Sequence, residues 1–176
     1  MTQPTEGPIT HLAVDHLAFP SWDVAATHDF YTRVPGFAFA GASRGDDGWG
    51  HGAFLHFGYR LGDAILTFFD LEGCARPDDG LPADLRHIAL RMESFEAVTV
   101  WHARLRDAGT HCWTEQHGAA RSVYVHDPNG IAIEFTHGPT EAGAAGTFGV
   151  LERWIAERSA GTASQASGDD AAPTGR

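Results

Sequence analysis

The sequence predicts an α+β fold made of two copies of one β-α-β-β-β module. The first observation is an internal repeat, in which the segments beginning at Asp15 and Arg86 share a pattern of His, aliphatic residue, Ala and apolar residue. The two copies are offset by 71 residues, as His16 and His87 show. The second observation is that each copy continues into a helical pattern and then into three short apolar runs typical of strands.

The first module is predicted over residues 9–72. Its helix is expected to begin after Ser21, a residue type that caps helices, and to end at Pro35-Gly36. Its helical stripe contains Val24, Thr27 and Tyr31. Three runs predict the strands that follow it, and they read "GFAFAGA", "GAFLHFGY" and "DAILTFFD".

The second module is predicted over residues 85–137. Ser94 is the candidate N-cap of its helix, Val98 and Leu105 lie on the apolar stripe, and Gly109 is a typical stop. The three strand-like runs of this copy read "THCWTEQ", "RSVYVHD" and "IAIEFTH".

The remaining segments have other compositions. Residues 73–84 are rich in Pro, Gly and Asp and are expected to form the linker between the modules. A helix is expected within 138–158, and the small and polar residues of 159–176 predict a disordered tail.

Composition restricts the function. A net charge of -11 argues against nucleic acid or an acidic membrane as a partner. The sequence contains no run of 18 apolar residues, so no membrane-spanning helix is predicted. Cys74 and Cys112 form no CxxC pair, and the N-terminus lacks the pattern of a signal peptide. A cytoplasmic location is therefore the expectation.

Three polar residues stand in the middle of apolar strand patterns: His16, His87 and Glu134. Each has an alanine two positions away on its own strand face, which leaves room beside the side chain. An ionised glutamate in an apolar concavity costs several kcal/mol unless it is compensated. Two imidazoles and one carboxylate around a divalent ion would compensate it and leave coordination positions open. The alternative is that the histidines are structural and that Glu134 lies on a solvent-facing surface.

The runs "DHLAF", "LRHIAL" and "RSVYVHDPNGIAIEF" resemble the vicinal oxygen chelate superfamily, which includes glyoxalase I, fosfomycin-resistance transferases, bleomycin-binding proteins and type I extradiol dioxygenases. The resemblance covers about residues 9 to 137. It implies paired βαβββ modules whose mixed sheets curl into a cup around a metal held by His16, His87 and Glu134. Thr67 stands where members with four ligands carry a further carboxylate, which implies a more open site here.

The stretch "HGAARSVYVHDPNGIAIE" is also similar to the extradiol dioxygenase signature. That similarity implies that His117 and Tyr124 bind substrate or oxygen, and His56 is a further candidate facing the cup. The sequence departs from the signature at Glu115, where a small or aliphatic residue is preferred. It also carries Asp63 where extradiol enzymes have their acid-base histidine.

The function expected from these residues is an Fe(II)-dependent dioxygenase that acts on a small aromatic or enediol-like substrate with O2. The rival enzyme is a glyoxalase-type lyase or isomerase that uses Mn, Zn, Ni or Co as a Lewis acid. The rival without catalysis is a drug-binding resistance protein. By resemblance the chain is expected to form a homodimer, with the cup closed either within one chain or across a swapped dimer.

Overall fold

A computed structural model describes residues 13–46, 53–78, 80–82, 85–139 and 149–166. The first module contains one helix and a four-stranded sheet in the order β1-β4-β3-β2. β1 and β4 are parallel, and the other neighbouring strands are antiparallel. Its elements are β1 (His16–Ser21), α1 (Val24–Arg33), β2 (Phe39–Asp46), β3 (Ala53–Leu61) and β4 (Ala64–Asp70).

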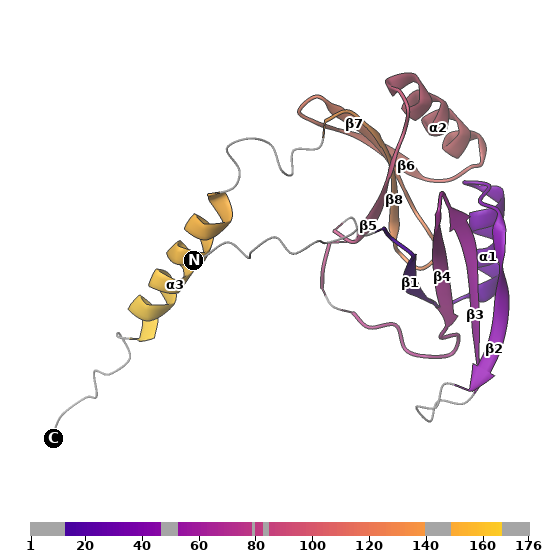
Figure 1. Cartoon of the computed structure of the whole chain (residues 1–176), viewed down its shortest axis with the longest axis horizontal. Coiled ribbons are helices and arrows are strands. Elements are labelled where there is room, and N and C mark those ends of the chain that lie inside the picture. The colour runs from indigo at the N-terminus through magenta and orange to yellow at the C-terminus, as the bar shows by residue number, and fades with distance from the viewer. Residues whose placement is uncertain (1–12, 47–52, 79, 83–84, 140–148, 167–176) are drawn as a thin grey trace.

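The second module repeats this topology, with the strand order β5-β8-β7-β6 and β5 parallel to β8. This confirms the predicted α+β fold of two βαβββ modules (Figure 1). Its elements are β5 (His87–Arg91), α2 (Phe95–Asp107), β6 (Cys112–His117), β7 (Ala120–His126) and β8 (Ala132–His137).

The helix starts agree with the expected caps in one module and differ in the other. Ser94 caps α2, because its hydroxyl accepts from the backbone N–H of Ala97 at 3.1 Å. In α1 the cap is Asp23, whose carboxylate accepts from Ala26 N–H at 2.8 Å. Ser21 was therefore the wrong cap: it is buried at the end of β1, and its hydroxyl lies 2.9 Å from that of Thr27. Asp and Ser are both strong N-caps. Asp23 is the cap because it directly precedes Val24, the first residue of α1.

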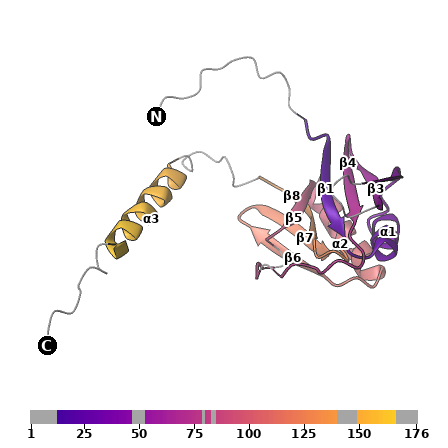
Figure 2. The ribbon, with the colours of Figure 1, turned by 90° about the horizontal axis from the view of Figure 1, so that it is seen from below.

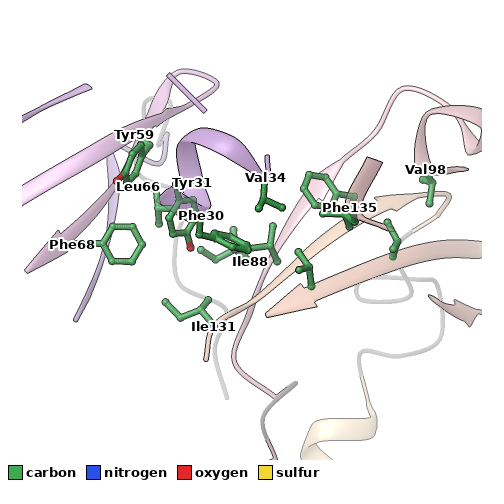
Figure 3. Close-up of a cluster of buried hydrophobic side chains, with 14 of the residues drawn as sticks. Phe30, Tyr31, Val34, Tyr59, Leu66, Phe68, Ile88, Val98, Ile131 and Phe135 are labelled. Atoms are coloured by element: carbon green, nitrogen blue, oxygen red, sulfur yellow. The ribbon is translucent and has the colours of Figure 1, made fainter. Parts of the chain in front are cut away.

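The hydrophobic core is one cluster that joins the two modules (Figure 3). In the first module the ring of Tyr31 on α1 lies 5.1 Å from Tyr59 and 5.0 Å from Phe68. In the second module Trp101 of α2 stacks on Phe135 of β8 at 4.1 Å. Each helix thus covers one face of its own sheet, which leaves the opposite face of each sheet for other contacts.

The Asp-Pro-Asn-Gly turn between β7 and β8 connects the modules. Its Asp127 and Asn129 are both buried. Asp127 accepts a hydrogen bond from the Tyr31 hydroxyl at 3.0 Å, and Asn129 Oδ1 accepts one from the backbone N–H of Trp22, also at 3.0 Å. A motif that reads as a local turn therefore fixes α1 against the second sheet.

A third helix, α3 (Val150–Ala166), follows the second module and lies away from both sheets in both views (Figures 1 and 2). It begins inside the predicted 138–158 segment and runs on into residues 159–166, for which composition predicted disorder. Trp154 and Ile155 on this helix are exposed. None of the helices in the described part of the chain is long and apolar enough to cross a membrane.

Candidate metal centre

The open face of the second sheet carries most of the candidate residues. Strand register places Trp113, Tyr124, Glu134 and Ala89 in one row across β6, β7, β8 and β5. A pocket of about 500 Å³ opens on this face. Its lining includes His87, Arg91, His117, Ser122, Tyr124 and Glu134.

Glu134 and His87 face each other at the base of this pocket. The Nε2 atom of His87 lies 3.3 Å from Oε2 of Glu134. Glu134 is only 7% exposed. Its other oxygen, Oε1, accepts a hydrogen bond of 2.5 Å from the Ser122 hydroxyl. Ser122 therefore orients the carboxylate so that its second oxygen is turned toward the imidazole.

This pair fits a divalent metal ion. Two ligands that each lie about 2.1 Å from one ion are separated by roughly 3.0–3.4 Å in octahedral or tetrahedral geometry. The 3.3 Å between His87 Nε2 and Glu134 Oε2 falls in that range. Ser122 supplies the outer hydrogen bond that ligating carboxylates normally receive. The nitrogen and oxygen donors suit iron, manganese, zinc, nickel or cobalt.

His16, the third predicted ligand, lies in the other sheet. Its side chain is 56% exposed at the start of β1, and its Nδ1 atom lies 2.6 Å from the Asp15 carboxylate. Within the described residues, no three His, Cys, Asp or Glu side chains gather into a group that could hold a metal ion. One chain thus brings His87 and Glu134 together but does not bring His16 to them.

Thr67 and His56 lie on the open face of the first sheet, beside a separate pocket. The buried Thr67 hydroxyl donates to the backbone carbonyl of Leu17 at 3.2 Å. The His56 ring stacks on Phe69 at 4.6 Å. His56 is therefore held by another sheet than His117 and Tyr124.

Tyr124 and His117 do meet. The Tyr124 hydroxyl lies 3.2 Å from Nε2 of His117. Burial raises the pKa of Tyr124 to about 12, and the negative charge of Glu134 adds to this shift while a hydrogen bond from Ser122 opposes it. At neutral pH Tyr124 is therefore a protonated phenol, able to donate a hydrogen bond into the pocket.

The predicted site residues leave out three contributors to this face. Ser122 holds Glu134 through a hydrogen bond. Trp113 stacks on Tyr124 at 5.1 Å with nearly parallel rings. His126 lies beside Trp113, and its buried Nε2 atom has no hydrogen-bond partner among the residues that the structure describes. Strand alternation, which places these residues on the face of Glu134, was the signal that could have found them.

Comparisons with known proteins agree with this architecture. A search of curated protein sequences gives no match. Among solved structures, a lactoylglutathione lyase from Agrobacterium tumefaciens is 20% identical with a TM-score of 0.56, covering 73% of this chain and 96% of its own. A variant of the fosfomycin resistance protein FosX from Listeria monocytogenes, complexed with Mn(II) and dihydroxypropylphosphonic acid, is 17% identical with a TM-score of 0.56, covering 76% and 98%. TnmS3, an antibiotic binding protein from a Streptomyces species, is 22% identical with a TM-score of 0.52, covering 76% and 100%.

At such identities these likenesses establish the fold alone, and the three proteins have different functions. The family assignment comes from the sequence itself. The model of one protein family matches residues 13–135, which span both modules from β1 to β8. The chain belongs to the Glyoxalase/Bleomycin resistance protein/Dioxygenase superfamily.

Proposed function

We propose that the protein is a metal-dependent enzyme, and that its reaction is the Fe(II)-dependent oxygenation of a small aromatic or enediol-like substrate. The observation that carries the proposal is the pairing of His87 with the buried Glu134, 3.3 Å apart in a pocket that also holds Tyr124 and His117. A binding protein without chemistry has no need to bury a carboxylate beside an imidazole at ligand spacing.

The third ligand in this proposal is His16 of a second copy of the chain. His16 is exposed on β1, and the open face of its sheet is lined by small residues such as Gly41, Ala42 and Gly58. A homodimer that sets this face against the open face of the second sheet would bring His16 to His87 and Glu134. Two-fold symmetry would create two equal sites.

Different residues around the His87–Glu134 pair would bind the substrate and transfer protons. An ion held there would polarise a chelated substrate oxygen and, as iron(II), would pass electrons from the substrate to dioxygen. The Tyr124 phenol would donate a hydrogen bond to substrate or oxygen. The Nε2 atom of His117, 3.2 Å from the Tyr124 hydroxyl, would stabilise the phenol oxygen through a hydrogen bond while the phenol hydrogen is used. The indole of Trp113, stacked on Tyr124, fixes the plane of the phenol.

The second candidate is a Lewis-acid lyase or isomerase that uses manganese, zinc, nickel or cobalt. One observation favours it. Asp63, at the position of the extradiol acid-base histidine, is exposed at the turn between β3 and β4 and does not line the pocket of the open face. A reaction that needs one proton shuttle, such as isomerisation next to a carbonyl, would require no more than Tyr124 and His117.

Metal analysis and oxygen uptake test these alternatives. The full chain is reconstituted anaerobically with Fe(II), Mn(II) or Zn(II), and bound metal is measured beside His87→Ala and the control His102→Ala, whose histidine lies on α2. We expect tight binding in the wild type and the control, and its loss in His87→Ala with an unchanged circular dichroism spectrum. Oxygen uptake with catechols by the iron form supports the dioxygenase. Metal binding without oxygen uptake supports the lyase or isomerase, and full occupancy in His87→Ala would contradict the site.

A further inference from the structure

We propose that Glu115 is a positioning residue that fixes the direction of the hydrogen bond between His117 and Tyr124. The inference deepens the proposed function, on which the catalytic use of this pair rests. Glu115 lies on β6 at the point where the sequence departs from the dioxygenase signature. Its side chain is 38% exposed, and it contacts two groups of the open face.

Each oxygen of Glu115 has its own partner. The indole N–H of Trp113 donates to Oε1 at 2.8 Å. Oε2 lies 3.0 Å from Nε2 of His117. Because Trp113 is stacked on Tyr124 and also contacts the tilted ring of His126, the direction of its N–H is set by the sheet and not by solvent. The carboxylate is thereby held with Oε2 facing the imidazole.

This contact decides which imidazole nitrogen carries hydrogen. A carboxylate accepts hydrogen bonds and donates none, and its negative charge 3.0 Å from Nε2 favours hydrogen on that atom. That holds both for the neutral ring with hydrogen on Nε2 and for the doubly protonated ring. The bare form of Nε2 would place its lone pair beside this charge and is disfavoured as long as Glu115 stays in place.

The same Nε2 atom lies 3.2 Å from the Tyr124 hydroxyl. The position of the imidazole hydrogen therefore also determines which of these two groups donates the hydrogen bond between them. An Nε2 atom that carries hydrogen cannot accept from Tyr124, and the phenol oxygen must act as the acceptor in that contact. The phenol hydrogen is then free to point away from His117, on the side of β7 where Glu134 is the neighbour of Tyr124 in the strand register. Glu115 thus turns the Tyr124 O–H away from His117 and toward the proposed metal side of the pocket.

Glutamine at position 115 would favour the opposite arrangement, in which Nε2 of His117 carries no hydrogen. Its amide has one acceptor oxygen, which the indole N–H of Trp113 requires. Its NH2 group would then face His117, and the partial positive charge of its hydrogens would favour a bare Nε2. The hydrogen of the neutral imidazole would move to Nδ1, although the shape of the residue at 115 hardly changes.

Nitrogen NMR of metal-free protein labelled in histidine tests this directly. The His117 signals are assigned by their absence in His117→Asn, and Glu93→Gln, which neutralises an exposed glutamate, serves as the charge-matched control. We expect the Nε2-protonated form in the wild type and the control, and the Nδ1-protonated form in Glu115→Gln. A bare Nε2 in the wild type, or a protonated Nε2 in Glu115→Gln, would overturn the proposal.

A Co(II) titration of the same proteins separates this inference from the proposed function. Glu115 lies outside the proposed ligand set, so Glu115→Gln should bind Co(II) as tightly as the wild type. Absence of Co(II) binding by the wild type would contradict the metal site, while the NMR result would still decide the role of Glu115. A loss of Co(II) binding confined to Glu115→Gln would contradict its assignment as a residue that acts through His117.

Discussion

Replacing Asp127 by asparagine should destabilise the protein through the joint between its two modules. The buried carboxylate accepts hydrogen bonds from the Tyr31 hydroxyl, the backbone N–H groups of Asn129 and Ile131, and the Asn129 amide. Asparagine keeps one acceptor oxygen for the two backbone donors, which both contact Oδ1, and presents an NH2 group to the other two donors. Two hydrogen bonds to a charged group are then lost, each with a net contribution of about 1.5–3 kcal/mol.

Part of that loss is offset because the substitution also removes a buried charge. Burial raises the pKa of Asp127, against the opposing effect of its hydrogen bonds, so the charged form carries a desolvation cost in the folded state. We therefore expect a net loss of about 2–3 kcal/mol in the free energy of unfolding, measured by urea denaturation. Asp29→Asn, which breaks an exposed pair with Arg33 on α1, is the control and should leave the midpoint unchanged.

The pH dependence gives a second check on Asp127. Burial raises the pKa of the Asp127 carboxyl above its ordinary value, so between the unfolded and the folded pKa the folded protein binds a proton that the unfolded chain does not. The contribution of the Asp127 carboxyl to the free energy of unfolding is therefore greatest at low pH, and it is lost as the pH rises through the pKa of the folded state. The difference between wild type and Asp127→Asn should widen as the pH is lowered from neutral. Equal stability of the two proteins at every pH would refute the structural role of the turn.

Three further predictions concern the tyrosines and the first sheet. Tyr124→Phe should slow turnover of the reconstituted enzyme by about 100–10,000-fold while leaving metal content unchanged, as a lost proton-transfer group does. The pKa values of Tyr59 and Tyr124 are raised to about 12 by burial, and burial also raises that of Tyr31. Phenolate absorbance should therefore stay low near pH 10 and rise only with alkaline unfolding, because the unfolded chain ionises first. Gly58→Ala should lower stability by about 1–3 kcal/mol in thermal unfolding, since a Cβ there would lie 2.9 Å from the Leu66 carbonyl oxygen.

Local patterns sufficed to predict the two modules. The repeat of His16 and His87, the apolar alternation of the strands and the helical stripes are all properties of short segments, and the structure confirms the β-α-β-β-β order of elements that they predict. Alternation groups the residues within each strand, and the register then places Tyr124 beside Glu134. The contact between His87 and Glu134 then follows from the parallel pairing of β5 with β8.

Contacts between distant segments could not be predicted in the same way. The Asp127 turn was recognised from its residues, but its bonds to Tyr31 depend on how the two modules pack. Glu115 was noticed only as a departure from a signature, because its role depends on the positions of Trp113 and His117. The position of His16 relative to His87 and Glu134 depends on how the two sheets are arranged. In the proposed metal centre it also depends on a second copy of the chain.

Metal binding by mixed variants tests the central claim most directly. His16→Ala and His87→Ala are each expected to bind no metal, because each lacks one ligand in every site. If the site is shared between copies, subunit exchange between the two variants creates a mixed dimer in which one site of two is complete. We predict recovery of about a quarter of the wild-type metal content after equal mixing and free exchange, since random pairing makes half of the dimers mixed. Metal content that stays at the level of the separate variants, despite demonstrated subunit exchange, would contradict a centre built from His16 of one copy and the His87–Glu134 pair of another.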